Sequence, residues 1–415
     1  MAKISIDFGT SNTTAARINP ATGLPEAIIF DENGTPKMPT VIYMTPQGIP
    51  VVGQQAYELT RDAEKMEAEE RTRIISSTIF SLKKKIKPDG FFSYDGGRIS
   101  HKDLVAAVIN KVKDEVENSC NFQEPLDEVT ITHPVIFEQW KKDILCEAAR
   151  KAGFSKVNLL EEPIAAAIGH IECSGLSSKG ILVYDFGGGT FDVAYVMKGL
   201  DGKYNVPIRP DGDPNCGGDD IDRLFYYRWN DISRSNLGRD LTPNKNIIDI
   251  SFLIRCHENK ETISKNYSLG PRTFREIVPP PGFNRLSMTI SPTDFDEMIS
   301  PIIDRTIEKT QRLLEKIKAN HYPLEHAILI GGSSRIPLVQ KKLSTILPIK
   351  PQKVMGTDIA VALGAIYDDS VIGEGVGYNQ YCFCTRCGEK IRRGYKYCIY
   401  DGSKNYVYSP KDKIC

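Results

Sequence analysis

The sequence predicts an α/β protein made of two related halves, followed by a short cysteine-rich tail. The main observation is an internal repeat: residues 4–11, Ile-Ser-Ile-Asp-Phe-Gly-Thr-Ser, recur in altered form at residues 182–190, Leu-Val-Tyr-Asp-Phe-Gly-Gly-Gly-Thr. Each copy has the pattern of a strand, an acid, a glycine turn and a hydroxyl residue. A second strand pattern follows each turn, at residues 13–18 and 191–197, so each copy predicts a β-hairpin.

Helical patterns follow both hairpins. Residues 101–116 place apolar side chains at helical spacing, namely Leu104, Val105, Val108, Ile109 and Val112. Further helices are predicted at residues 137–152, 247–263 and 293–319. Strands that alternate with helices in this way indicate α/β layers.

Two more strand patterns accompany the hairpins. Residues 129–134 form a buried-strand pattern that Pro134 ends, and residues 327–332 repeat the form of a strand followed by glycines. Residues 270–283 form a polar or proline-rich stretch, and glycines accumulate after Tyr367. We interpret that last composition shift as a linker.

Composition argues against several classes of protein. The chain has 415 residues, which suggests two to three domains, and its 53 basic and 53 acidic residues balance. This charge balance does not favour a nucleic-acid or membrane partner. No stretch approaches the roughly 18 apolar residues of a membrane span, and residues 1–6 lack a secretory signal pattern. We therefore expect a cytoplasmic protein whose scattered cysteines, Cys120, Cys146, Cys173, Cys216 and Cys256, are reduced.

The paired glycine turns predict a phosphate site. Two such turns facing each other across a cleft can present backbone N–H groups where no side chain blocks a phosphate. Asp7 and Asp185, at the ends of the two first strands, would project into the same cleft, where their oxygens suit a Mg²⁺ that keeps most of its waters. A single Asp-x-Gly-Thr segment is equally typical of a plain β-turn, but two copies favour the phosphate interpretation.

Two further segments strengthen this interpretation: residues 162–167, Glu-Pro-Ile-Ala-Ala-Ala, and residues 329–337, Leu-Ile-Gly-Gly-Ser-Ser-Arg-Ile-Pro. In this order, the set resembles the nucleotide-binding domain of the 70-kilodalton heat-shock chaperones, in the actin, sugar kinase and chaperone superfamily. The resemblance covers about residues 2–370. It implies a two-lobed actin-like ATPase fold with duplicated ribonuclease H-like lobes: lobe I at 1–180, lobe II at 181–370 and a linker at 371–380.

The resemblance also implies roles for individual residues. The first phosphate loop would consist of Asp7, Gly9, Thr10, Ser11 and Asn12, and the second of Asp185, Gly187, Gly188, Gly189, Thr190 and Asp192. Lys83 would reach the γ-phosphate, although a lysine run such as 83–85 is by itself typical of a solvated surface. Glu162 would order the Mg²⁺ waters and the attacking water. The nucleotide would further contact Gly217, Gly218, Asp219, Lys260, Ser264, Gly331, Gly332, Ser333, Arg335 and Asp358.

One position departs from the family pattern. His257 stands where the family usually has a glutamate, one helical turn before Lys260, and Glu258 is displaced from that place by one residue. A displacement of one residue rotates a helical side chain by about 100°. We therefore expect an altered ribose contact and weaker nucleotide affinity.

The tail at residues 381–415 resembles a degenerate zinc ribbon. Cys384-Thr-Arg-Cys387-Gly is an intact knuckle, whereas in Cys398-Ile-Tyr-Asp401-Gly an aspartate replaces the fourth cysteine. We predict one structural Zn²⁺ held by Cys384, Cys387, Cys398 and Asp401. Cys382, Cys415 or water are alternative fourth ligands, and a metal-free ribbon or redox-active thiols remain the alternative.

The reaction implied is attack of water on the γ-phosphate of ATP, with slow turnover. The leading function is that of a chaperone-like ATPase whose nucleotide state controls a protein client or docking partner. Fewer than fifty residues follow Tyr367 in this sequence, too few for a peptide-binding β-sandwich and lid. The alternative is a regulatory switch or scaffold that docks a folded partner through the tail. An actin-like filament protein and a sugar kinase rank lower, and a monomer is expected.

Overall fold

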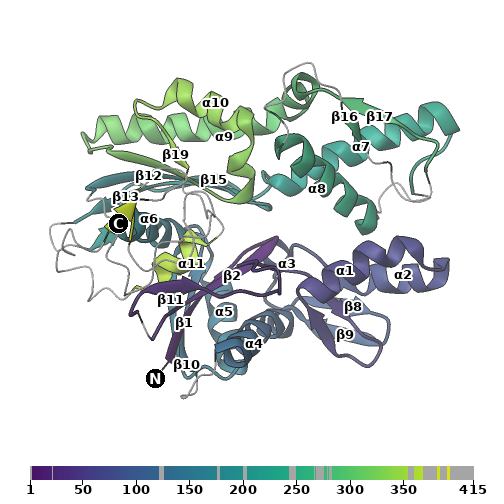
Figure 1. The fold of residues 1–415 in the computed structure, drawn as a ribbon, viewed down its shortest axis with the longest axis horizontal. Coiled ribbons are helices and arrows are strands. Elements are labelled where there is room, and N and C mark those ends of the chain that lie inside the picture. Colours follow the sequence, from purple (N-terminus) through teal and green to yellow (C-terminus); the bar gives the residue numbers. More distant parts are fainter. Residues whose placement is uncertain are drawn as a thin grey trace.

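The structure is a computed structural model of the chain. It describes residues 2–20, 22–120, 126–174, 178–199, 203–242, 249–265, 267, 275–277, 279, 283–353, 359–367, 381–383 and 390–392. Two lobes face each other, each with a central sheet covered by helices (Figure 1). Within the described residues, no helix is long and apolar enough to cross a membrane.

The sheet of lobe I has the strand order β11-β10-β1-β2-β3. β1 (Ala2–Phe8) pairs antiparallel with β2 (Asn12–Ile18) and parallel with β10 (Leu126–His133), which pairs parallel with β11 (Lys156–Glu161). β3 (Pro25–Ala27) and β4 (Met38–Pro39) extend β2. The apolar faces of α4 (His101–Cys120) and α5 (Gln139–Lys151) pack into the core beneath this sheet.

The sheet of lobe II repeats this arrangement in the order β14-β13-β12-β18-β19. β12 (Gly180–Phe186) pairs antiparallel with β13 (Phe191–Lys198) and parallel with β18 (His326–Ile330), which pairs parallel with β19 (Gln352–Lys353). β14 (Tyr204–Asn205) and β15 (Asp211–Asp213) extend β13. The apolar side chains of α9 (Pro292–Ala319) and α10 (Pro337–Ile346) pack into the core of lobe II.

The two sheets therefore have the same topology, a hairpin followed by parallel strands, and the predicted duplication is confirmed. The hairpin register places Asp7 opposite Thr14 in lobe I and Asp185 opposite Asp192 in lobe II. The turn of each hairpin is the glycine segment that carries the repeat. Both turns therefore lie at the same end of their sheets.

Each lobe also carries an outer part. In lobe I it consists of β5 (Ile42–Met44), β6 (Pro50–Val52), α1 (Gln54–Asp62), the 3₁₀ turn Ala63–Lys65, α2 (Ala68–Ser76), β7 (Thr78–Ile79), α3 (Leu82–Lys85), β8 (Phe91–Tyr94) and β9 (Gly97–Ser100). In lobe II it consists of α7 (Gly218–Leu237), α8 (Ile250–Lys265), β16 (Arg275–Ile277) and β17 (Met288–Ile290). β16 lies inside the stretch that the sequence marks only as polar or proline-rich.

Two helices cross between the lobes. α6 (Glu162–Ser174) follows the last strand of the lobe I sheet, yet its alanines pack into the core of lobe II with Ile181, Val183 and Ile328. α11 (Ala360–Ala365), late in the chain, returns to lobe I, where Ser5 Oγ donates to the Ala362 carbonyl oxygen at 2.6 Å. The two helices meet at glycines, because a Cβ added to Gly364 would lie 1.8 Å from the Ala165 carbonyl oxygen.

Candidate functional site

The two glycine turns, one from each lobe, touch each other. A Cβ added to Gly188 would lie 1.9 Å from Ser11 Oγ, and one added to Gly189 would lie 2.5 Å from Thr10 Cγ2. Only glycine allows this approach without displacing the opposite loop. The structure thus brings together the two predicted phosphate loops, which are far apart in the sequence.

The first turn is tight in itself. A Cβ on Gly9 would lie 2.1 Å from the carbonyl oxygen of Asn12, the first residue of β2. The backbone N–H of Thr40 donates to the Ser11 carbonyl oxygen at 2.8 Å, and so holds the turn from the side. Glycine is therefore required for the turn of this hairpin.

Other predicted residues gather around the second turn. The backbone N–H groups of Gly218 and Asp219 donate to the carbonyl oxygens of Gly187 and Gly188, at 3.0 and 2.7 Å. Ser333 Oγ donates to the Gly187 carbonyl oxygen at 2.8 Å. A Cβ on Gly217 would lie 2.4 Å from the Gly188 carbonyl oxygen. Two separate segments of lobe II, residues 217–219 and Ser333, therefore meet at this loop.

An acidic cluster lies next to the turns, around the ammonium of Lys83. Lys83 Nζ donates to Glu162 Oε1 at 2.6 Å, and the two side chains are only 11% and 10% exposed. Asp7 accepts a hydrogen bond from Thr132 Oγ1 at 2.8 Å. Asp185 and Asp192 face each other across the β12–β13 hairpin.

The electrostatics of the cluster show an excess of negative charge. Burial raises the pKa of Asp185 well above its usual range, and the carboxylates of Glu162, Asp192 and Asp7 add to the rise. Burial and Glu162 likewise raise the pKa of Asp192 to about 8, against the opposing effect of Lys83. Burial lowers the pKa of Lys83, but Glu162 and Asp7 outweigh it and the net shift is upward. Lys83 is therefore positively charged.

The three lysines at residues 83–85 have different surroundings in the structure. The ammonium of Lys84 lies 3.8 Å from Asp220 Oδ2 in lobe II, while Lys85 is exposed. Lys83 is the member of the run that reaches the acidic cluster, and its contact with a γ-phosphate stays a prediction.

Sequence reasoning missed several side chains that join the lobes. Ser81 Oγ of lobe I donates to Asp219 Oδ2 of lobe II at 2.7 Å, from a residue with a left-handed backbone (φ 52°). Further out, Arg71 Nη2 lies 2.6 Å from Asp249 Oδ2. The glycine and acid patterns that revealed the loops do not mark these residues, although Ser81 stands only two positions before Lys83.

His257 lies in a charged network on α8. Its Nδ1 is 3.1 Å from Asp222 Oδ2, and its Nε2 is 3.3 Å from Glu261 Oε1. Burial and Lys260 lower the pKa of His257, but its hydrogen bonds to Asp222 and Glu261 outweigh them, so the pKa rises to about 9. Lys260 Nζ lies 2.8 Å from Asp222 Oδ1 and donates to the Gly218 carbonyl oxygen at 3.0 Å.

The remaining predicted residues lie on neighbouring segments. Gly331 has a positive φ of 78° at the end of β18, and a Cβ there would lie 2.4 Å from the Phe186 carbonyl oxygen. Gly332 borders open space, and Arg335 is exposed on the same 3₁₀ turn, Gly332–Arg335. Ser264 lies one turn after Lys260 on α8. Asp358 lies outside the described residues.

Comparison with known proteins decides the family. The model of the family described as "Hsp70 protein" matches residues 3–375. The chain belongs to the Hsp70 family. A curated Hsp70 relative, "Chaperone protein DnaK" of Thermoplasma acidophilum, is 30% identical over 379 residues. The match covers 89% of this chain and 58% of that protein.

Membership of the Hsp70 family confirms the two-lobed actin-like ATPase fold that the sequence predicted. Proteins of this family are ATP-binding chaperones with ATPase activity, and they use Mg²⁺. The chain spans somewhat over half the length of the curated relative, 58%.

The acidic cluster fits the Mg²⁺ that the Hsp70 family uses. Carboxylate oxygens are the ligands that Mg²⁺ prefers, and a divalent cation would relieve the repulsion that raises the pKa values of Asp185 and Asp192. In the part of the chain that the structure describes, no three His, Cys, Asp or Glu side chains are grouped to hold an ion directly. Binding of Mg²⁺ by Asp7 and Asp185 through water molecules stays a prediction.

The structure does not test the predicted zinc site. Cys384, Cys387, Cys398 and Asp401 all lie outside the described residues. Two strands of the tail are described, β20 (Tyr381–Phe383) and β21 (Lys390–Arg392), and they pair antiparallel. The first predicted knuckle falls in the segment between them.

Proposed function

We propose that this chain binds ATP with Mg²⁺ in the cleft between its lobes and hydrolyses it slowly. The observation that carries the proposal is the buried ion pair of Lys83 and Glu162, placed beside Asp7, Asp185 and Asp192 where the glycine turns of both lobes touch. Phosphoryl transfer depends on positioning and charge neutralisation more than on covalent chemistry. A single cation among acids next to two glycine loops suits that task.

Each residue has a distinct part in this proposal. Lys83 neutralises charge on the γ-phosphate, and Glu162 orients the attacking water. Asp185 and Asp192, on facing strands, would hold Mg²⁺ through its water molecules, and the Thr190 hydroxyl lies in the adjoining turn. When bound, Mg²⁺ would neutralise phosphate charge and fix the geometry of the triphosphate.

The phosphate groups would lie against the two turns, at Gly9, Thr10, Ser11 and Asn12 from lobe I and Gly187, Gly188 and Gly189 from lobe II. We assign the nucleoside to the segments of lobe II that surround the second turn. Ser333, Gly218 and Lys260 already contact that turn or its neighbours. The proposed nucleoside contacts are Gly217, Gly218, Asp219, Lys260, Ser264, Gly331, Gly332, Ser333, Arg335 and Asp358.

Single-turnover hydrolysis of radiolabelled ATP tests the proposal. The wild-type chain should form ADP slowly in the presence of Mg²⁺. Asp185→Asn should lose most of this activity while it still binds nucleotide, because the backbone of the turn stays in place. Equal hydrolysis by the two proteins would reject the role of Asp185.

We further infer that nucleotide-dependent closure of the lobes controls a protein partner. A cavity of about 500 Å³ is lined by residues of both lobes, so movement of one lobe against the other would change its shape. The lining residues are His133, Val135, Leu159, Leu160, Glu161, Ile164, Tyr204, Asn205, Val206 and Pro210.

The partner is either an unfolded client, as for a chaperone, or one folded protein, as for a regulatory switch or scaffold. Affinity capture under ATP and under ADP separates the two. Nucleotide-dependent recovery of many unfolded proteins supports the chaperone. One stoichiometric folded partner supports the switch, and recovery that does not depend on nucleotide contradicts both.

The organisation of the chain follows from the same proposal. We assign residues 1–180 to lobe I, 181–370 to lobe II, 371–380 to a linker and 381–415 to a tail that holds one Zn²⁺. We also propose a cytoplasmic monomer, in keeping with the unpaired thiols of Cys146, Cys216 and Cys256.

Elemental analysis of the purified chain tests the zinc proposal. We expect about one equivalent of zinc, lost in the double variant Cys384→Ser/Cys387→Ser, because thiolates are the main ligands of a structural zinc site. Less than about a tenth of an equivalent after expression in zinc-rich medium would contradict it.

A further inference from the structure

The strand β21 of the tail lies against helix α6. In Figure 1 a strand of the yellow tail is drawn beside α6, far in sequence from the helix that it accompanies. β21 is held in a hairpin by β20, with Cys382 opposite Ile391. The tail hairpin, defined here as β20 and β21, is therefore in contact with the ATPase lobes.

The helix that β21 contacts is directly connected to the acidic cluster. The first residue of α6 is Glu162, whose carboxylate is 2.6 Å from Lys83 Nζ. The helix follows β11 of lobe I and precedes β12 of lobe II, so its position depends on both lobes. A displacement of α6 would therefore move Glu162 relative to Lys83.

The other contacts of α6 join it closely to α11 and to the core around it. A Cβ on Gly169 would lie 2.3 Å from the Ala360 carbonyl oxygen of α11, and Ala165, Ala166 and Ala167 are fully buried. A helix packed this closely moves as a rigid body rather than by local bending. A contact anywhere along α6 is thus transmitted to its first residue.

The charges of the two elements are complementary. β21 has the sequence Lys-Ile-Arg, with two cations in three residues. α6 has Glu172 in its last turn and no basic residue there, and the C-terminal end of a helix carries a partial negative charge.

We propose that the tail hairpin docks on α6 and restrains ATP turnover. While docked, it holds α6 where Glu162 engages the ammonium of Lys83, and this ion pair keeps both groups from the phosphate and the attacking water. Release of the hairpin frees α6 and raises the rate of hydrolysis. The regulatory part rests on the proposed ATPase function, whereas the docking itself does not.

Hydrogen–deuterium exchange of the full chain without nucleotide tests the docking. Ile391→Pro should break β21, because proline cannot take part in the strand ladder. Exchange in residues 162–174 should then rise on the order of threefold, as expected when a packed element is uncovered. The matched control, Ile414→Pro, places the same substitution after the hairpin and should leave this exchange at the wild-type rate.

If the proline variant fails to fold, a variant with reversed charge on β21 tests the same docking. Lys390→Glu with Arg392→Glu introduces no proline into the strand but reverses the charge of β21, so it should weaken docking and give the same rise in exchange. Wild-type exchange in both folded variants would overturn the docking.

Single-turnover hydrolysis by the same proteins tests the restraint. We expect a rate on the order of threefold higher in the two hairpin variants and unchanged in Ile414→Pro. Increased exchange with an unchanged rate would overturn the restraint. An absence of hydrolysis in every protein would instead reject the ATPase function, and the exchange result would still decide the docking.

Discussion

Lys83 differs from the adjacent lysines in what its ammonium faces. Its neighbours Lys84 and Lys85 lie near Asp220 or at the surface, whereas Lys83 is enclosed by acids from three separate strands and from α6. Burying a cation costs free energy of folding unless opposite charges, here the carboxylates, pair with it. At the residue scale, the function proposed above depends most on this side chain.

Replacing Lys83 should affect the chemical step more than binding. Lys83→Ala should lower the turnover number on the order of a hundredfold with little change in nucleotide affinity, because the ammonium acts on charge that develops at the γ-phosphate. Steady-state hydrolysis and equilibrium binding measure the two effects separately. Lys87→Ala is the control, since Lys87 is exposed on the same segment. Unchanged turnover in Lys83→Ala would remove it from the catalytic group.

His257 gives a prediction about pH. Its pKa is about 9 in the folded protein against 6.5 for an ordinary histidine. Its ion pairs with Asp222 and Glu261 therefore stabilise the fold fully below pH 6.5, and this stabilisation is lost as the pH rises through 9. His257→Gln should cost about 1 kcal/mol at pH 6, a value reduced for solvent screening because the ring is 37% exposed, and little at pH 10.

Urea unfolding at the two pH values measures this cost. The control His321→Gln alters an exposed histidine and should not change the pH dependence. An equal loss of stability at pH 6 and pH 10 in His257→Gln would show that the charge of the ring is irrelevant.

At the scale of elements, the sequence predicted best where a pattern is repeated or long. Both hairpins follow from one sequence motif that occurs twice, and α4 follows from its apolar side chains at helical spacing. β16 was missed because it is three residues long and owes its existence to pairing with β17. Short strands of this kind are determined by their partners rather than by local preference.

The crossing of α6 and α11 could not be predicted from local sequence. Nothing near Gly364 indicates that its helix will meet Ala165 on a helix almost two hundred residues earlier. The same limit applies to Ser81 and Arg71, whose partners lie in the other lobe. The loop residues of the site could be predicted because close approach to phosphate requires glycine. Contacts between the lobes require no particular residue pattern, so the sequence does not reveal them.

The α6–α11 crossing should be sensitive to a single methyl group. Gly364→Ala should destabilise the fold by about 2 to 3 kcal/mol, because the added Cβ would lie 1.8 Å from a backbone oxygen that cannot move alone. Urea unfolding without nucleotide measures the loss. Gly332→Ala is the control, since nothing lies within 4 Å of its added Cβ. Equal stability of the two variants would contradict the close packing.

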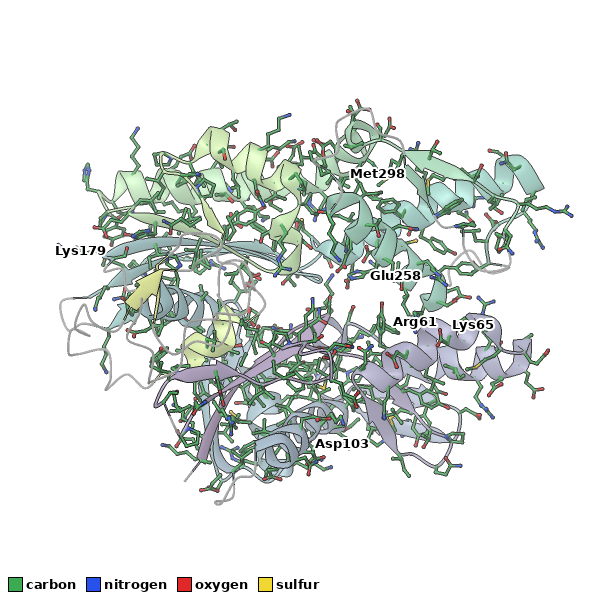
Figure 2. All side chains as sticks on the ribbon, in the orientation of Figure 1. Arg61, Lys65, Asp103, Lys179, Glu258 and Met298 are labelled. Atoms are coloured by element: carbon green, nitrogen blue, oxygen red, sulfur yellow. The ribbon has the colours of Figure 1, made fainter. Side chains whose placement is uncertain are left out.

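At the scale of the whole molecule, the lobes are joined at several levels around the cleft. The ion pair of Arg71 and Asp249 and the hydrogen bond of Ser81 and Asp219 connect the outer parts, while α6 and α11 connect the bases (Figure 2 shows Arg61 of lobe I and Glu258 of lobe II on facing helices). The nucleotide would bind between these contacts. Its binding energy is therefore coupled to the relative position of the lobes.

Unfolding of the full chain with and without nucleotide tests the central claim most directly. At a hundred times the dissociation constant, ATP or ADP with Mg²⁺ should stabilise the folded protein by about 2.7 kcal/mol, measured as a rise in the midpoint of thermal unfolding. Omission of Mg²⁺ should reduce the rise, because the acidic cluster then repels the phosphates. A midpoint that is the same with ATP, with ADP and without nucleotide would contradict a nucleotide site in this cleft.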